Sequence, residues 1–382
     1  MKKEILYFGK MDLPFNNASA CRVMGICSSL KKSGFDCFTY GYTKGKTFNG
    51  NADNINFEND RYPNKLLSYL FTFGNNKRIK KVLKKHNVEN IKAIFFTSLG
   101  HGQIKYLGKW CRKHQIPLIN DRGDIIRSSH KNFLFKPISS KEYKLFEKAV
   151  RKYASVMSIS TFINNYVEKQ GINSFIVPCI ANNESVRFNV EASKNVDDSK
   201  INIGYFGDPG KDFYKDRLDW CLDAFAKLNN PNISFYVGGV NLNQIPEKYR
   251  DNKHFIFLGK LSNKECISYI KSLDFTVLFR ENTEIANAGF ASKITESFAC
   301  GVPVLSNITG DLKHYLNNNN SITSEGFDKE SCYLLFEKLN LVTKNSVSNL
   351  KKYIYKNNQL LSDKWSKTLT TNINEIEERI KQ

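Results

Sequence analysis

Two charged side chains one helical turn apart, Lys293 and Glu296, mark the start of a predicted helix in the run NAGFASKITESFACGVPVLSN. The start of a helix leaves backbone N–H groups unpaired and carries a partial positive charge, so it favours an anion. Ser292 is expected to cap this helix, while Gly289 and Ala291 let a ligand approach the backbone closely. The Glu296 carboxylate can accept two hydrogen bonds from a vicinal diol. Phosphate at the helix start and ribose hydroxyls one turn deeper describe a nucleotide diphosphate.

An ordinary helix explains the same residues about equally well. Ser292 would then be a cap and Glu296 a surface side chain, although their spacing is not that of a capping box. The local pattern leaves both interpretations open.

The elements that must position this segment alternate between short apolar runs and amphipathic stretches. The runs at 4–9, 92–98, 116–121 and 275–280 have the length of buried strands, and helical patterns separate them. This β-α-β order predicts an α/β fold with doubly wound parallel sheets. Such sheets bind ligands at the carboxyl ends of their strands, and the charged helix start follows the strand at 275–280.

A polar stretch without either periodicity, residues 183–200, interrupts this order and predicts a linker. It separates a domain at 1–182 from a domain at 201–355, and their first strands, EILYFGK and NIGYFGD, are alike. Residues 356–382 are basic and helical in period, and we expect this helix to return to the first domain.

Composition limits the class of protein. Lys and Arg total 57 against 37 for Asp and Glu, and the net charge of +20 favours a nucleic acid, an anionic membrane or phosphorylated ligands. A solvated basic surface explains the charge as well, and no nucleic-acid-binding module is recognisable. Nine cysteines without a C-x-x-C pair are typical of reduced, buried thiols in a cytosolic protein. No run of about 18 apolar residues occurs, so we expect a soluble or peripheral protein.

Motifs for several other chemistries are missing from the sequence. It contains no Asp-x-Asp for a metal-bound diphosphate, no G-x-G-x-x-G, no P-loop and no Ser/Cys–His motif. We therefore expect no metal and no cofactor, with Lys and Arg acting in place of a metal ion.

The run AGFASKITESFACGVPVLSN resembles the donor-site signature of the retaining glycosyltransferases of family GT4, which have the GT-B fold. The residues that match are Gly289, Phe290, Glu296, Ala299, Cys300, Gly301, Pro303 and Val304. More narrowly, LFREN and AGFASKITES resemble a bacterial surface-polysaccharide branch in which an arginine, here Arg280, ends the strand. The resemblance implies two Rossmann-like domains facing across a cleft. The acceptor would bind residues 1–182 and the nucleotide sugar residues 201–355.

The resemblance also implies roles for individual residues. Glu296 would bind the donor ribose, and the segment Gly289–Lys293 would face the diphosphate and the sugar. In a second match, YFGDPGKDFYKDRLDWCLDAF, the family places a basic residue against the diphosphate at the start of the following helix; Lys215 fits best, then Arg217. Lys215 and Arg280 are catalytic candidates because cations stabilise the charge that grows on a departing diphosphate. A solvent-facing Lys215 is the alternative.

One position departs from the signature. Its first glutamate, which contacts the donor sugar, aligns with Ala288. Either Glu281 or Glu284 supplies the carboxylate instead, or the sugar is held without one.

In the N-terminal half, Asn16, Asn17 and Ala18 follow the first strand, where related enzymes have glycines near the acceptor and the phosphate. Asn17 fits an N-cap slightly better than a ligand contact. Asp124 ends another strand where related enzymes carry a His, Asp or Glu at the reaction centre, although Asp-x-Gly-Asp is also a common turn. His101 is placed similarly.

Residues 61–86 mix aromatic side chains with many lysines, and Ile79, Val82 and Leu83 form the apolar stripe of a short basic helix. Such a helix binds an anionic membrane with about 1 kcal/mol per basic residue, or is a surface helix with a solvated face. Related enzymes extend lipid-linked sugars at the cytoplasmic leaflet. This implies a cytoplasmic protein, peripheral at the inner face of the plasma membrane, with a lipid-linked oligosaccharide acceptor.

The expected function is retaining transfer of one hexose-type sugar from a nucleotide diphosphate sugar to a growing surface polysaccharide. Two other classes stay open. The first is a nucleotide-sugar epimerase or a degenerate partner subunit with the same fold, which Ala288 favours. The second and weaker one is a basic nucleic-acid-binding protein.

Overall fold

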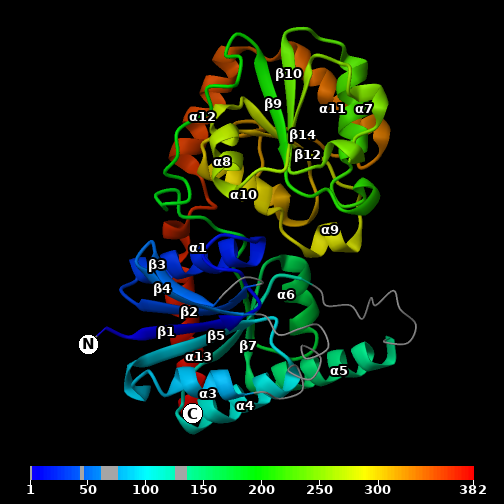
Figure 1. Ribbon diagram of the computed structural model, residues 1–382. Coiled ribbons are helices and arrows are strands. Elements are labelled where there is room, and N and C mark those ends of the chain that lie inside the picture. The colour runs from blue at the N-terminus through cyan, green and yellow to red at the C-terminus, as the bar shows by residue number, and fades with distance from the viewer. Residues whose placement is uncertain (1, 44–46, 62–75, 125–135) are drawn as a thin grey trace. The chain divides into compact units, whose positions relative to one another are not determined.

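A computed structural model describes residues 2–43, 47–61, 76–124 and 136–382. The chain forms two compact units, Met1–Asn182 with Ser362–Gln382, and Asn183–Leu361 (Figure 1). The aromatic part of the 61–86 stretch lies outside the described residues.

The first unit is built on a sheet in the order β3-β4-β2-β1-β5-β6-β7-β8, in which β3 runs antiparallel to β4 and the other neighbours are parallel. The strands are β1 (Glu4–Gly9), β2 (Asp36–Thr43), β3 (Phe48–Ala52), β4 (Ile55–Arg61), β5 (Ile91–Thr97), β6 (Leu118–Arg122), β7 (Ser155–Ser158) and β8 (Ser174–Ile176). The helices are α1 (Ala18–Lys32), α3 (Lys77–Leu83), α4 (His101–Lys113), α5 (Lys136–Tyr153), α6 (Thr161–Glu168) and α13 (Ser366–Lys381).

The β3–β4 hairpin at the edge of this sheet is not predicted by the sequence pattern, because its strands are rich in asparagine. Its two turn residues, Asp53 and Asn54, both have positive φ, 53° and 60°. A two-residue hairpin turn of type I′ requires this conformation, which Asp and Asn adopt more readily than most residues. The Asp-Asn pair is therefore the signal that identifies the hairpin.

A helix from the far end of the chain completes the first unit. Leu369 and Ile376 of α13 belong to the same buried apolar cluster as Val23 of α1. Between the two helices, Thr370 Oγ1 donates a hydrogen bond to Ser33 Oγ at 2.9 Å. Both helices thus cover the same side of the first sheet (Figure 1).

The second unit contains a parallel sheet in the order β11-β10-β9-β12-β13-β14. The strands are β9 (Ile201–Phe206), β10 (Ile233–Gly238), β11 (Phe255–Gly259), β12 (Phe275–Leu278), β13 (Val304–Asn307) and β14 (Ser321–Ser324). The helices are α7 (Leu218–Leu228), α8 (Asn263–Ser272), α9 (Glu284–Ala288), α10 (Ser292–Ala299), α11 (Lys329–Glu337) and α12 (Lys344–Asn357). The α/β fold with largely parallel sheets is confirmed in both units.

Residues 183–200, the stretch that reads as a linker, belong to the second unit and are bound to α8. Lys271 Nζ donates hydrogen bonds to the carbonyl oxygens of Phe188 at 2.6 Å and Val190 at 3.0 Å. Ser268 Oγ donates another to the carbonyl of Glu191 at 2.8 Å. Backbone carbonyls, which sequence periodicity does not reveal, fix this polar stretch.

Candidate functional site

The order in which the chain adds strands to the second sheet reverses between β9 and β12. In its strand order, β10 lies on one side of β9 and β12 on the other. Doubly wound sheets bind ligands at the carboxyl ends of strands at such a switch point. Gly207 directly follows β9, and Arg280 lies just beyond the end of β12, so both are at this position.

The charged residues at this switch point all contact one buried carboxylate, that of Asp216. It accepts hydrogen bonds from Tyr205 Oη at 2.9 Å, from Arg280 Nε at 2.8 Å and from Lys293 Nζ. Lys293 Nζ also donates to the Tyr205 hydroxyl at 2.9 Å. Asn307 holds the Arg280 backbone, because its Oδ1 accepts from the Arg280 N–H at 2.9 Å. The structure thus joins two predicted site residues, Arg280 and Lys293, through an aspartate and a tyrosine that sequence reasoning missed.

The charges of this cluster shift the pKa values of its members. Burial alone would raise the pKa of Asp216, but the positive charges of Lys293 and Arg280 hold it well below its usual range. Burial lowers the pKa of Lys293; Asp216 opposes this, whereas Arg280 and Lys215 lower it further. Burial and the Asp216 charge raise the pKa of Tyr205, so its hydroxyl stays a donor. Two cations against one buried anion leave one net positive charge, which suits a diphosphate.

A glycine makes room for the lysine of this cluster. Gly207 has φ of +122°, and a Cβ atom there would lie 2.8 Å from Cε of Lys293. Any other residue would strain the backbone and push against this side chain. The position of the Lys293 side chain therefore requires a glycine directly after β9.

Helix α10 begins at Ser292, and Ala291 occupies the N-cap position without a side-chain hydrogen bond. The prediction that Ser292 caps the helix is therefore wrong, because Ser292 is already the first helical residue. The preceding loop contains the short helix α9, which the sequence pattern does not predict, and Ala288 at its end is buried. Gly289 and Phe290 connect the two helices.

Phe290 has a packing role in this connection. Its ring meets that of Tyr315 edge-on, with centroids 5.4 Å apart, beside a buried apolar cluster that includes Ala291 and Leu312. These contacts hold the connection and give the Phe290 ring a function that needs no ligand.

Lys215 and Arg217 precede helix α7, which begins at Leu218. Lys215 is exposed, and within the described residues its side chain forms no hydrogen bond or ion pair. Arg217, in contrast, donates to both carboxylate oxygens of Asp219 at 3.1 and 2.6 Å and to Glu281 at 2.7 Å. Lys215 is thus open to a ligand, whereas Arg217 and Glu281 are bound to each other.

Glu296, one turn into α10, contacts an arginine from the 183–200 stretch. Arg187 Nη2 donates to Glu296 Oε1 at 2.5 Å, and Arg187 Nε donates to Asn263 Oδ1 at 2.9 Å. The Glu296 side chain remains 23% exposed. Sequence reasoning missed Arg187, because an isolated arginine in a polar stretch gives no signal.

In the first unit, Asn17 caps α1 by accepting a hydrogen bond from the Ala20 N–H at 2.9 Å. Asn16 donates to Asp12 Oδ1 at 3.3 Å, and Ala18 is the first residue of the helix. The structure supports the capping interpretation of Asn17. It gives the loop a structural role and leaves its contact with a ligand a prediction.

The predicted catalytic Asp124 is exposed just beyond β6, and residues 125–135 after it lie outside the described residues. The buried acid at this strand end is Asp121, which accepts from Tyr7 Oη at 2.5 Å and Arg22 Nε at 2.9 Å. His101 is held by Glu142, whose carboxylate contacts Nδ1 at 2.6 Å. Each unit therefore has a Tyr–Asp–Arg cluster that starts from the tyrosine of its first strand.

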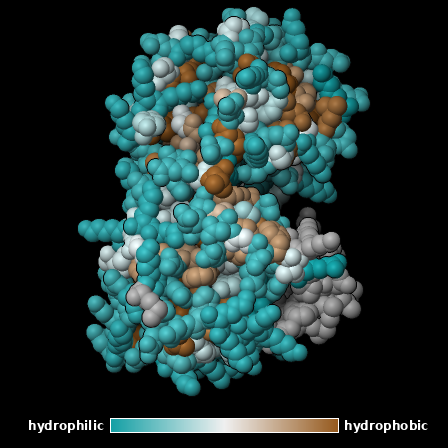
Figure 2. Space-filling view, turned by 60° about the vertical axis from the view of Figure 1, so that its left-hand side comes forward, coloured by the Kyte–Doolittle hydropathy of each residue, from teal (hydrophilic) through white to brown (hydrophobic). Residues whose placement is uncertain are grey.

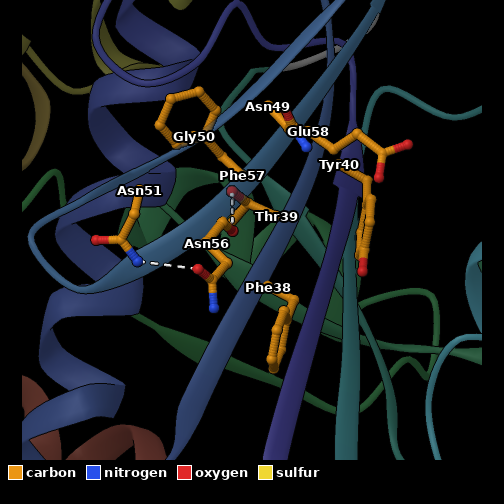
Figure 3. A pocket seen from close by; sticks show the side chains of 9 residues that line it. All are labelled: Phe38, Thr39, Tyr40, Asn49, Gly50, Asn51, Asn56, Phe57 and Glu58. Carbon is orange, nitrogen blue, oxygen red and sulfur yellow. Dashed lines mark hydrogen bonds between the residues drawn. The ribbon is translucent and has the colours of Figure 1, made fainter.

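A groove of about 460 Å³ lies on the first unit, over one face of β2, β3 and β4. Figure 3 shows its lining, which consists of Phe38, Thr39, Tyr40, Asn49, Gly50, Asn51, Asn56, Phe57 and Glu58. Asn51 Nδ2 donates to Asn56 Oδ1 at 2.9 Å inside it. Among the described residues, no lysine or arginine lines the groove.

The short basic helix α3 differs from its prediction in one respect. Its apolar stripe, Ile79, Val82 and Leu83, is buried in the first unit and cannot insert into a membrane. No helix within the described residues is long and apolar enough to span a bilayer. Figure 2 shows a face that is mostly hydrophilic, with separate apolar patches. Only electrostatic attraction is left for a membrane contact through α3.

The chain resembles known proteins in part of its sequence and in its fold. Residues 206–360 match the model of the family "Glycosyl transferases group 1". Sucrose-phosphate synthase from Thermosynechococcus elongatus has a similar structure, with a TM-score of 0.65 at 10% identity over 98% of this chain and 99% of that chain. HepE from Anabaena, in complex with UDP and glucose, has a TM-score of 0.66 at 12% identity over 98% and 100%. A glycosyltransferase from Rickettsia africae has a TM-score of 0.65 at 14% identity over 98% of both chains. The sequence matches none of the curated proteins with which it was compared.

These likenesses show the fold. The chain has the GT-B fold with two Rossmann-like domains, as predicted. Its second unit carries a glycosyl transferases group 1 domain that contains Asp216, Arg280, Lys293 and Glu296. The fold of the chain and the domain matched in its second unit are thus both ones found in GT-B glycosyltransferases.

Proposed function

We propose that this protein transfers a hexose-type sugar, with retention, from a nucleotide diphosphate sugar to a growing surface polysaccharide. The observation that carries the proposal is the pair of cations, Arg280 and Lys293, held by the buried Asp216 at the switch point of a group 1 domain. Similar structures hold UDP with glucose, or UDP-glucose, which supports a UDP-sugar as the first donor to test.

In the proposed complex, the diphosphate lies against Lys293 and Arg280 at the start of α10, with Lys215 reaching it from solvent. Because Asp216 fixes both cations beforehand, they need no rearrangement when negative charge grows on the leaving diphosphate. Glu296, one turn deeper, accepts hydrogen bonds from the ribose hydroxyls. We propose that cations of the chain take the place of a metal ion.

For the acceptor, we propose a lipid-linked oligosaccharide at the inner face of the plasma membrane. The net charge of +20 supports attraction to anionic lipids, which is worth about 1 kcal/mol per basic residue near the surface. Since the apolar stripe of α3 is buried, this attraction is electrostatic and should weaken as salt is added.

A catalytically degenerate partner subunit or a nucleotide-sugar epimerase is the second candidate. It is favoured by the buried Ala288, which replaces the sugar-contacting glutamate, and by Glu281, whose carboxylate is bound to Arg217. Release of UDP together with a new glycosidic product would support the transferase. Nucleotide-sugar binding without transfer would support the second candidate.

Calorimetric titration with UDP and GDP tests the donor site directly. Lys215→Ala should weaken binding by a few-fold, because one exposed charge contributes about 1 kcal/mol or less. Glu296→Ala should weaken it by about tenfold or more, because hydrogen bonds to a charged acceptor contribute about 1.5–3 kcal/mol. Unchanged affinity in both variants would exclude this placement of the nucleotide.

A further inference from the structure

The carboxylate assigned to the ribose is held in place before any ligand arrives. Arg187 donates from Nη2 to Glu296 Oε1 at 2.5 Å, and only 6% of the Arg187 side chain is exposed. The guanidinium is itself fixed, because Nε donates to Asn263 Oδ1 at 2.9 Å and the group lies 5.2 Å from the Phe188 ring centroid. Glu296 is therefore paired with a group that has little freedom of its own.

The pairing leaves part of the carboxylate open. Arg187 uses Oε1 of Glu296, and within the described residues Oε2 accepts no hydrogen bond. The side chain keeps 23% exposure, and a carboxylate has lone pairs for about four hydrogen bonds. A ribose hydroxyl can therefore bind Glu296 while Arg187 stays in place.

A purely structural role for Arg187 would be to fasten the 183–200 stretch to the second unit. That stretch is already fastened without it, because Lys271 Nζ donates to the carbonyls of Phe188 and Val190 and Ser268 Oγ to that of Glu191. The 183–200 stretch thus has anchors besides the Arg187–Glu296 pair, and the pair also orients the Glu296 carboxylate.

We propose that Arg187 is a positioning residue for the donor site and raises the preference of the protein for ribonucleotides. The proposal rests on the proposed function, in which Glu296 binds the ribose. A free glutamate side chain has several rotatable bonds whose freedom is lost on binding, and Arg187 removes this freedom beforehand. The expected result of losing Arg187 is weaker discrimination between a ribose and a deoxyribose, with the phosphate contacts intact.

The test is a calorimetric comparison of UDP with 2′-deoxy-UDP, and of GDP with 2′-deoxy-GDP. The wild-type protein should prefer the ribonucleotide by about tenfold, the effect of one hydrogen bond to a charged acceptor. Arg187→Met should reduce this ratio several-fold, and Arg187→Lys should restore part of it. The double variant Arg187→Met with Glu296→Gln should show the same ratio as Glu296→Gln alone. Arg187 acts through Glu296, so its loss should have no further effect once the Glu296 carboxylate is gone.

Lys271→Met is the matched control, because it removes an anchor of the same stretch without contacting Glu296. It should lower the melting temperature and leave the ratio unchanged. If Arg187→Met keeps the wild-type ratio while Glu296→Gln loses it, the positioning role is wrong and the donor site stands. If Glu296→Gln keeps the ratio, or wild-type protein binds none of the nucleotides, the ribose contact itself is wrong and the inference falls with it.

Discussion

The buried carboxylate of Asp216 should be one of the most costly side chains to neutralise in the second unit. Asp216→Asn keeps the shape but removes the charge that pairs with Arg280 and Lys293, two cations whose side chains are 10% and 19% exposed. Loss of one member of a buried pair leaves uncompensated charge and costs about 3–5 kcal/mol. The free energy of unfolding of the second unit should fall by this amount.

The chain offers a matched control in Asp223 of α7. Its carboxylate contacts two lysines, Lys248 and Lys329, and the hydroxyl of Tyr249. These lysines are 64% and 46% exposed, so Asp223→Asn should cost about 1 kcal/mol or less.

Urea unfolding measures both changes in the second unit if Trp110 and Trp365 are replaced by Phe, because Trp220 then supplies the fluorescence. Equal losses in Asp216→Asn and Asp223→Asn would refute the reasoning, since burial would then not decide the strength of the two clusters.

Two further outcomes are expected at the same site. Because the folded-state pKa of Asp216 is depressed, its contribution is present above the unfolded pKa of about 3.9 and is lost as the pH falls below that value. The stability gap between wild type and Asp216→Asn should therefore be largest near neutral pH and shrink below about pH 4; urea unfolding at several pH values checks this, and a constant gap would contradict it. Gly207→Ala should destabilise the second unit by about 1–3 kcal/mol, because alanine is strained at a φ of +122°. It should also weaken UDP binding by displacing Lys293, and calorimetry with unchanged affinity would count against that contact.

The sequence predicted the order of strands and helices well, because buried strands and amphipathic helices have distinct periodicities. It also identified Arg280, Lys293 and Glu296 as members of one loop and helix, since they follow a single strand in the chain. Their grouping around a common acid depends on Asp216, which enters from the loop after a different strand. No local pattern reports such a contact, because periodicity carries no information about which loops meet.

The same limit explains the other misses. Arg187 stands in a polar stretch without period, and it contacts Glu296, which is more than a hundred residues away in the chain. The strands of the β3–β4 hairpin are rich in asparagine and have few apolar residues, so its Asp-Asn turn is the clearest sequence signal for it. Serine is a common N-cap residue, but helix α10 already begins at Ser292 and the N-cap position falls on Ala291. The Ser292 hydroxyl therefore does not cap the helix.

The contribution of α13 to the first unit has a consequence for synthesis on the ribosome. Leu369, Ile373 and Ile376 fill the apolar core around β1 and α1, yet they are translated after every residue of the second unit. The first unit leaves the ribosomal exit tunnel first, but its core stays incomplete until α13 has been translated. All residues of the second unit are available before that point. Domains usually mature in the order of translation; here the nascent chain should reach its native state in the reverse order.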